Sequence, residues 1–228
     1  MQLSIIIPVF NERATVLDVL DRVEATAVDA EIILVDDGST DGTREILHAR
    51  TEASRGRIAL LRHPVNRGKG AAVVTGAARA TREYVIVQDA DLEYDPADYV
   101  RLLAAAHDRG AAAVYGSRFH RGSPEMFLRQ VIGNRLLTGL TNLLYGSALT
   151  DMETCYKLVR RSLFQELRIT SRRFDVEPEV TAKLLKKGVT IHEVPISYKG
   201  RSFAEGKKIS WVDFVSAVWT LVRLRVSG

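Results

Sequence analysis

Short runs of β-branched residues alternate with longer segments of helical periodicity over the first 120 residues of the chain. Because parallel strands need a crossover connection, this alternation predicts an α/β fold with a mostly parallel sheet and helices on both faces. Right-handed crossovers bring the carboxyl ends of such strands to one edge of the sheet. We expect strands at Leu3–Val9, Glu31–Val35, Ile58–Arg62, Tyr84–Gln88 and Ala112–Gly116, and helices at Arg13–Ala25, Thr43–Ala53, Lys69–Ala80 and Pro96–His107.

The pattern changes after Arg118 and becomes mainly helical. Helical spacing of apolar residues predicts helices at Met126–Tyr145, Phe174–Lys187 and Ile209–Val226. An alternating segment at Val189–Ser197 predicts one more strand. No internal repeat or linker divides the 228 residues, so we expect a single domain.

Composition excludes several classes of protein. Cys155 is the only cysteine and forms no internal disulfide, which favours a reducing compartment. The five histidines are scattered, without the spacing of zinc ligands. The first eight residues lack the features of a signal peptide, and no apolar run approaches the roughly 20 residues of a membrane span.

Positive charge is concentrated at the end of the chain. From Ser197 onward, six basic and two acidic residues give a difference of +4, which equals the formal net charge of the whole chain. This segment is suited to phosphates, an anionic membrane surface or nucleic acid. Aromatic residues do not interleave with the basic ones as stacking platforms do, so we expect no nucleic-acid partner.

Three acids, Asp89, Asp91 and Glu93, directly follow the apolar run Tyr84–Val87. Carboxylates this close repel one another unless a cation lies between them, and ligands of α/β sheets bind at strand ends. An isolated D-x-D is equally compatible with a solvated acidic turn. Together with the rest of the chain, the motif predicts a divalent metal that holds a phosphorylated ligand.

A second pair of acids, Asp36 and Asp37, follows the strand predicted at Glu31–Val35. Acids at such a position accept hydrogen bonds from the ribose or base of a nucleotide. The turn after the first strand contains no glycine, and Gly68-Lys69-Gly70 completes neither G-x-G-x-x-G nor a Walker A loop. The sequence therefore disfavours a nicotinamide or flavin enzyme.

In combination, these motifs resemble family 2 glycosyltransferases with the type A nucleotide-sugar fold. The matching segments span about the first 120 residues: Ile5–Glu12, Val35–Thr43, Asn66–Gly70, Gln88–Glu93 and Gly116–Phe119. The later part resembles the branch of dolichyl-phosphate mannose synthases and bacterial polyprenyl-phosphate sugar synthases, through Thr150–Lys157, Arg173–Glu179 and Arg201–Lys208. The resemblance implies a nucleotide-sugar-binding half at 1–120 and an acceptor-binding half, with the basic segment, at 121–228.

The resemblance also implies roles for individual residues. The nucleoside would contact Pro8, Phe10, Glu12 and Asp37, with Asp89 and Ala90 on the ribose side. Asp91 and Glu93 would hold Mg²⁺ or Mn²⁺ against the donor diphosphate, and hard oxygen ligands suit such ions. Candidate diphosphate clamps are Lys69, Arg201, Lys207 and Lys208. Arg118 and Arg129 would hold the acceptor phosphate, which makes Asp91 and Arg118 the expected catalytic residues.

The activity implied is inverting transfer of a sugar to a polyprenyl phosphate of the dolichyl or undecaprenyl type. A phosphate monoester is already an anion and needs no strong general base, so Asp151 and Glu153 remain open between structural roles and roles as a base or acceptor contact. The alternatives are a family 2 enzyme with a soluble or polysaccharide acceptor, in which either acid would act as the base, and a non-catalytic nucleotide-sugar-binding module.

We expect a UDP-sugar rather than GDP-mannose as donor, because Glu153–Lys157 is similar to the broader bacterial branch. The expected location is the cytoplasmic face of the membrane, as a peripheral enzyme of cell-envelope synthesis. The helices at Met126–Tyr145 and Ile209–Val226 combine apolar residues with arginine, as interfacial helices do. Their apolar faces are equally suited to the core or to a dimer interface, so a second copy or a separate membrane protein is a further candidate partner.

Overall fold

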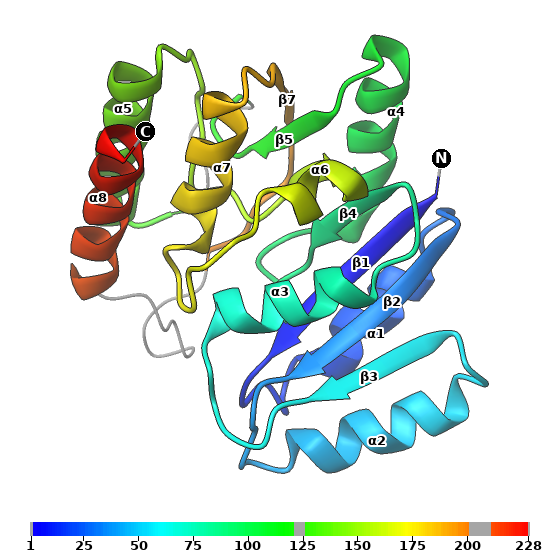
Figure 1. Cartoon of the computed structure of the whole chain (residues 1–228). Helices are drawn as coiled ribbons and strands as arrows, with labels where there is room; N and C mark the ends of the chain where they lie inside the picture. Colours follow the sequence, from blue (N-terminus) through cyan, green and yellow to red (C-terminus); the bar gives the residue numbers. More distant parts are fainter. Residues whose placement is uncertain (1, 121–125, 201–210, 228) are drawn as a thin grey trace.

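The computed structural model describes residues 2–120, 126–200 and 211–227. In these residues a seven-stranded sheet has the order β3-β2-β1-β4-β6-β5-β7, with helices on both faces (Figure 1). The strands are β1 (Leu3–Val9), β2 (Ala30–Asp36), β3 (Ile58–Arg62), β4 (Tyr84–Val87), β5 (Ala113–Ser117), β6 (Lys157–Arg160) and β7 (Ile191–Pro195). The helices are α1 (Val16–Glu24), α2 (Thr43–Ala53), α3 (Lys69–Arg79), α4 (Tyr99–Arg109), α5 (Leu128–Tyr145), α6 (Arg161–Glu166), α7 (Val176–Lys186) and α8 (Trp211–Val226), with a 3₁₀ turn at Pro96–Asp98 before α4.

The apolar run of β1 is buried on both faces, as in other parallel sheets. Leu3, Ile5 and Ile7 belong to one core cluster, which also contains apolar residues of α1, α2 and α4. Ile6 points to the opposite face and packs in a second cluster with residues of α3, α6 and α7. The sheet is therefore the middle layer, and the loops that follow its strands are available to form the site.

β6 and α6 are elements that sequence analysis did not predict. β6 pairs antiparallel with both β4 and β5, whereas the other pairs of neighbouring strands run parallel. The expectation that all strands end at one edge is therefore wrong for β6. Every helix and strand that the sequence analysis predicted is present, and its ends differ from the predicted ones by at most three residues.

The largest shifts, of three residues, are at the starts of α1 and α4, and α1 begins at Val16 rather than at Arg13. The preceding residues are held in a loop by contacts with the start of α2 and with the loop after β4. The backbone N–H of Glu12 donates to Thr43 Oγ1 at 3.1 Å, and Thr15 Oγ1 donates to the carbonyl of Ala90 at 2.6 Å. Asn11 has a left-handed φ of 53°, a conformation that asparagine tolerates. These contacts shorten the helix and bring Glu12 toward the acids after β4.

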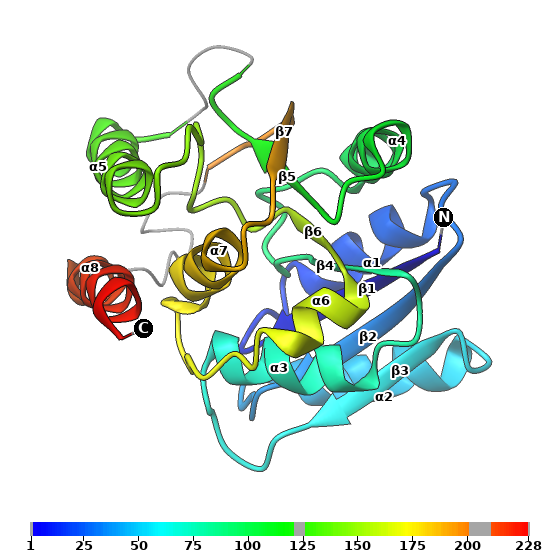
Figure 2. The same ribbon diagram turned by 45° about the horizontal axis from the view of Figure 1, so that its top comes forward.

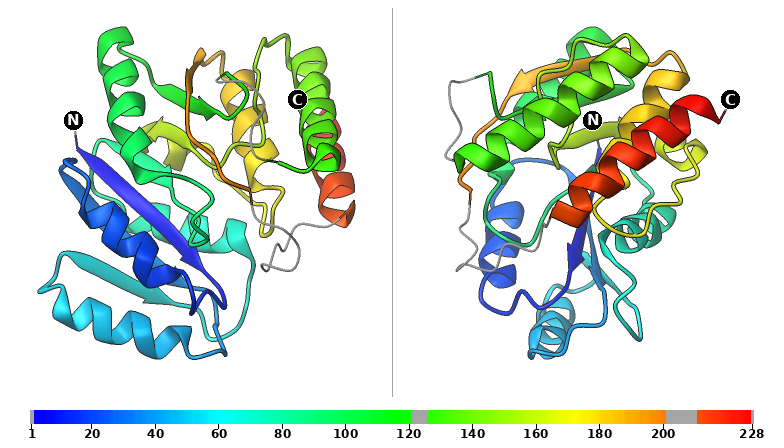
Figure 3. Two further views of the ribbon diagram at one scale, coloured as in Figure 1. Left: turned by 180° about the vertical axis from the view of Figure 1, so that it is seen from behind. Right: turned by 90° about the vertical axis from the view of Figure 1, so that its left-hand side faces the viewer.

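Helices α5, α7 and α8 pack together beside the sheet, as Figures 1 and 2 show from two directions. A small third core joins them through Leu137, Met152, Ala182, Ala217 and Leu221. α5 and α8 are the outermost elements of this group (Figure 3, right). Among the described residues, no helix is both long enough and apolar enough to cross a membrane.

Candidate active site

A cavity of about 1080 Å³ lies where β1, β2, β4 and β5 end, and α5 and α8 line its other side. This volume is at the upper end of small-molecule sites, large enough for a nucleotide and part of a second substrate. Arg201, Lys207 and Lys208 lie outside the described residues. The other predicted site residues all line this cavity: Pro8, Phe10, Glu12, Asp37, Lys69, Asp89, Ala90, Asp91, Glu93, Arg118 and Arg129.

Lys69, at the start of α3, bridges two carboxylates from distant parts of the chain. Its Nζ lies 2.8 Å from Asp89 Oδ1 and 2.8 Å from Glu177 Oε1. Burial by itself lowers the pKa of Lys69, but the nearby negative groups, Asp89 foremost, raise the pKa well above its usual value. The ammonium is therefore always charged, and it neutralises part of the acidic strand end.

The two acids predicted to hold a metal follow at a strained turn. Leu92 between them has a φ of 61°, a left-handed conformation that costs a non-glycine residue about 1 kcal/mol. Asp91 Oδ1 accepts a hydrogen bond from the backbone N–H of Glu93 at 3.1 Å, and Glu93 accepts one from the hydroxyl of Tyr198. The turn thus fixes both acids at the cavity wall.

The oxygen donors of Asp91 and Glu93 suit Mg²⁺ or Mn²⁺. Within residues 2–120, 126–200 and 211–227, no three His, Cys, Asp or Glu side chains converge to form a complete metal cage. Mg²⁺ commonly binds one or two carboxylates and completes its coordination with water and substrate phosphates. The residues present therefore fit a metal that arrives with a diphosphate.

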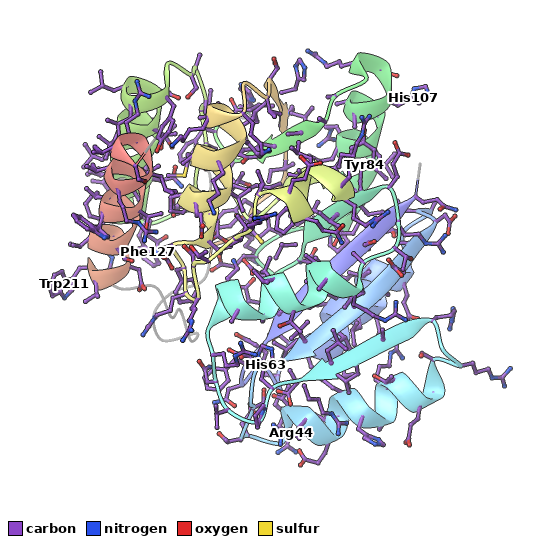
Figure 4. All side chains as sticks on the ribbon, viewed as in Figure 1. Arg44, His63, Tyr84, His107, Phe127 and Trp211 are labelled. Atoms are coloured by element: carbon purple, nitrogen blue, oxygen red, sulfur yellow. The ribbon has the colours of Figure 1, made fainter. Side chains whose placement is uncertain are left out.

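Asp37 holds a loop in place. Its carboxylate accepts backbone N–H groups of Arg67 at 2.9 Å and Gly68 at 2.8 Å, and its Oδ1 lies 2.6 Å from Nδ1 of His63. His63 lies against α3, where its Nε2 is 3.0 Å from Oγ1 of Thr75 (Figure 4). These three partners show that the almost fully buried Asp37 orders residues 63–68; because Asp37 also lines the cavity, its contact with the nucleoside stays a prediction.

The Gly68-Lys69-Gly70 sequence also has a structural explanation. Gly68 has a φ of 95°, and a Cβ at Gly70 would lie 2.3 Å from the carbonyl oxygen of Ser171. The glycines therefore allow the start of α3 to pass against residues 171–172, where Ala71 N donates to Arg172 O at 3.1 Å. This close approach carries Lys69 toward α7.

Arg118 and Asp151 form a buried bidentate ion pair. Arg118 Nε and one terminal nitrogen each lie 2.7 Å from an Asp151 oxygen, and the backbone N–H of Arg118 donates to Oδ2 at 3.0 Å. The guanidinium also lies 5.0 Å from the ring centroid of Tyr198. Asp151 is fully buried, and its oxygens are taken by this contact. The geometry favours the structural alternative for Asp151.

Glu153 differs from Asp151 although it lies only two residues away. It lines the cavity, and its buried Oε1 has no hydrogen-bond partner in the described part of the chain. Burial and the negative charge of Glu177 raise the pKa of Glu153 to about 7, against the smaller opposite effects of Lys157 and Arg118. A carboxyl group in this environment titrates near neutral pH.

Glu177 and Tyr198 are cavity residues to which sequence analysis gave no role. Glu177 is in the first turn of α7, inside the Arg173–Glu179 motif that contributed only to the resemblance. Tyr198 follows β7, which runs parallel to β5 and ends at the same edge of the sheet. The rule that residues directly after parallel strands meet at one edge of the sheet, applied to the strand predicted at Val189–Ser197, would have found Tyr198.

Comparisons with known proteins agree with this architecture. The model of the family described as glycosyl transferase family 2 matches residues 4–168. Curated relatives include the uncharacterized protein MJ0544 of Methanocaldococcus jannaschii, 31% identical over 202 residues (84% of this chain and 86% of the relative). Another is polyprenol monophosphomannose synthase of Mycolicibacterium smegmatis, 26% identical over 227 residues (94% of this chain and 85% of the relative).

Similar solved structures include glucosyl-3-phosphoglycerate synthase from Mycobacterium tuberculosis in complex with Mn²⁺, UDP and phosphoglyceric acid. It has a TM-score of 0.72 and 20% identity, over 99% of this chain and 78% of that one. This likeness concerns the fold, which is the type A glycosyltransferase fold. Because the family model matches more than half of the residues, including the acids after β4, the chain belongs to glycosyl transferase family 2.

Proposed function

We propose that this chain transfers a sugar from a nucleotide sugar to a polyprenyl phosphate at a membrane surface, with inversion at the anomeric carbon. The observation that carries the proposal is the continuity between the cavity and an exposed apolar surface. Met126, Trp211 and Phe214 line the cavity, and Trp211 is also 78% exposed at the start of α8. A ligand with a polar head in the cavity and an apolar chain along these helices would use both surfaces.

We call the exposed apolar side of these two helices the α5–α8 face. Figure 3 (right) presents the two helices side by side, and in Figure 4 the labelled Trp211 projects away from the body of the protein. Isolated exposed apolar residues are ordinary, whereas a contiguous set marks a binding surface. The members of the face are Leu128, Ile132, Leu136 and Leu143 of α5, and Trp211, Val212, Val215, Trp219, Val222 and Val226 of α8.

The donor would occupy the side of the cavity formed by β1, β2 and β4. Asp91 and Glu93 would hold Mg²⁺ or Mn²⁺, which stabilises the negative charge of the departing nucleoside diphosphate. Pro8, Phe10, Glu12 and Asp37 would contact the nucleoside. We propose a UDP-sugar as the donor, as the sequence motifs favour.

The acceptor phosphate would lie between the strand edge and α5. Arg118, whose orientation Asp151 fixes, and Arg129 of α5 would bind its oxygens. One phosphate oxygen would attack the anomeric carbon with its lone pair, while the bond to the diphosphate breaks and its electrons leave with that group. An anionic nucleophile of this kind requires no base, so neither Asp151 nor Glu153 needs to take a proton.

The similarity to polyprenol monophosphomannose synthase, which extends over 94% of this chain, supports a lipid acceptor. A soluble acceptor remains the second candidate. Both candidates share the same donor chemistry and differ in the apolar chain. The α5–α8 face favours the lipid.

The proposal is tested by incubating the full chain with Mn²⁺, one of two donors (UDP-glucose or GDP-mannose) and one of two acceptors (geranylgeranyl phosphate or 3-phosphoglycerate). Mass spectrometry of the products gives the result. We expect a glycosyl geranylgeranyl phosphate and no glycosyl phosphoglycerate. Transfer to 3-phosphoglycerate alone would contradict the lipid acceptor, and donor binding without transfer to either acceptor would favour a non-catalytic module.

A further inference from the structure

Glu153 is the cavity acid that the proposed transfer leaves without a task. It lies in the segment between α5 and β6, and its Oε1 is buried without a hydrogen-bond partner among the residues the structure describes. A buried polar atom in a native protein is nearly always satisfied, so an unsatisfied one in a cavity needs an explanation. A bound substrate that supplies the missing partner is such an explanation.

The neighbouring charged groups already have other partners. Asp151 is bound to Arg118, and Glu177 to Lys69. Lys157 donates its ammonium hydrogens to the backbone carbonyls of Met152 and Thr154. Among the residues that the structure describes, no cation therefore forms an ion pair with the carboxyl group of Glu153.

We propose that Glu153 binds the acceptor phosphate as a neutral carboxylic acid, donating its O–H to a phosphate oxygen, so that acceptor binding takes up a proton. This inference rests on the proposed function only in requiring that the acceptor carries a phosphate. An ionised carboxylate would repel the phosphate, whereas the protonated acid supplies a charge-assisted hydrogen bond. The proton comes from solvent on binding and stays on Glu153 during transfer, so the covalent step is unchanged.

The charges that face Glu153 decide its protonation. Burial raises the pKa of Glu153 most, followed by repulsion from Glu177, and Asp151 raises it too. Lys157 and Arg118 lower this pKa. The resulting pKa of about 7 leaves the group about half protonated at neutral pH. An incoming phosphate anion adds another negative charge and raises this pKa further, which is why binding and proton uptake are coupled.

The test uses geranyl phosphate as the probe, titrated calorimetrically into the full chain without donor. Experiments in two buffers with different ionisation enthalpies measure the protons taken up. We expect uptake approaching one proton at pH 8 for wild type and none for E153Q. A pKa of about 7 also predicts that the affinity of wild type, relative to that of E153Q, falls about 15-fold between pH 7.0 and 8.5.

Comparison of E153Q with a second variant, E153A, separates the effect of the charge from that of the hydrogen bond. E153Q keeps a donor, so at pH 6.5 we expect it to bind the probe within about tenfold of wild type. E153A has no donor and is expected to bind more weakly than E153Q at every pH. E52Q, a change on exposed α2, is the control and should behave as wild type. Thermal unfolding of each variant establishes that it is folded.

The outcomes separate this inference from the proposed function. Sugar transfer to polyprenyl phosphate with the same proton uptake in wild type and E153Q would overturn the inference and leave the function intact. Uptake that depends on Glu153, without any sugar transfer, would support the inference and contradict the function. Loss of over 99% of turnover in E153Q at every pH, with normal probe binding, would identify Glu153 as a general base and overturn the inference.

Discussion

Lys69 Nζ lies 2.8 Å from Oδ1 of Asp89, so the first acid of the Asp89–Glu93 motif already has a cation bound to it before any metal arrives. The same ammonium contacts Glu177. The acidic strand end is therefore divided. Asp89 is neutralised by the protein itself, while Asp91 and Glu93 are the acids that the turn at Leu92 directs to the cavity wall.

Replacing Lys69 with methionine would leave Asp89 and Glu177 largely buried without their shared cation. Removing one partner of a buried pair is strongly destabilising, so we expect the free energy of unfolding to fall by about 3 kcal/mol. Urea unfolding at pH 7 measures the change. The double variant K69M/E177Q should recover part of the loss, because it removes one of the two stranded charges. Equal stability of K69M and wild type would contradict the ion-pair description.

Replacing Asp91 with asparagine keeps the size of the side chain but removes its charge. We expect metal-dependent transfer to fall more than about 100-fold while the fold is retained, because the metal would lose one of its two protein ligands. Turnover measured across a Mn²⁺ titration, with circular dichroism for the fold, checks this. E45Q on α2 is the control for loss of an acid away from the site. Near-normal turnover of D91N without metal would show that the assigned role is wrong.

Arg129 is predicted to contact the acceptor only. A charge-assisted hydrogen bond contributes about 1.5–3 kcal/mol, so R129A should raise the KM for the lipid phosphate roughly 10- to 100-fold. The KM for the donor should stay within about twofold. Initial rates with each substrate varied in turn give both constants. An equal rise in the two would place Arg129 at the donor or in the fold instead.

Stability should depend on pH through Glu153. Its pKa is raised to about 7 in the folded protein from an ordinary value of 4.5, so between these pH values the folded state holds a proton that the unfolded chain has released. Stability therefore falls as pH rises through this window, by about 1.4 kcal/mol per pH unit at most, and is lowest above pH 7. Urea unfolding of wild type and E153Q at pH 5 and 8 tests the sign. The free energy of unfolding of E153Q, relative to that of wild type, should be higher at pH 8 than at pH 5. The opposite order would contradict the raised pKa of Glu153.

The parallel strands β1, β2 and β4 were predictable because each contains a continuous, largely buried apolar run, and β7 was predictable from its alternation of apolar and polar residues. β6 was not, since only Leu158 and Val159 lie in its interior and basic residues occupy both ends. Its antiparallel pairing with β4 and β5 depends on partners more than 40 residues away, which no local pattern encodes.

The cavity residues were predictable for the same topological reason, but their bonding was not. That Asp37 holds residues 63–68, and that Lys69 bridges Asp89 and Glu177, follow from contacts across 20 to 108 positions of the chain. The sequence analysis left Asp151 and Glu153 as equivalent alternatives. Their separation needed the observation that Arg118 binds one and leaves the other facing the cavity.

The α5–α8 face is predicted to bind a lipid bilayer. Trp219 is 64% exposed in the middle of α8, and Arg223 and Arg225 follow it in the last turn. Indole side chains favour the membrane interface, while arginines are attracted to anionic headgroups. We expect wild type to float with vesicles that contain anionic lipid, and W219E to lose this binding because the face then carries a charge that must be buried in the bilayer.

The matched control for W219E is V100E, which places the same charge at a 54% exposed valine on α4, away from the α5–α8 face. V100E should float as wild type does, and W219E should still transfer sugar to the soluble probe geranyl phosphate, since Trp219 is not among the residues that line the cavity. Size-exclusion chromatography tests whether a second copy of the chain binds the α5–α8 face instead. A wild-type dimer that W219E converts to a monomer, without vesicle binding by either, would assign the face to a second copy of the chain.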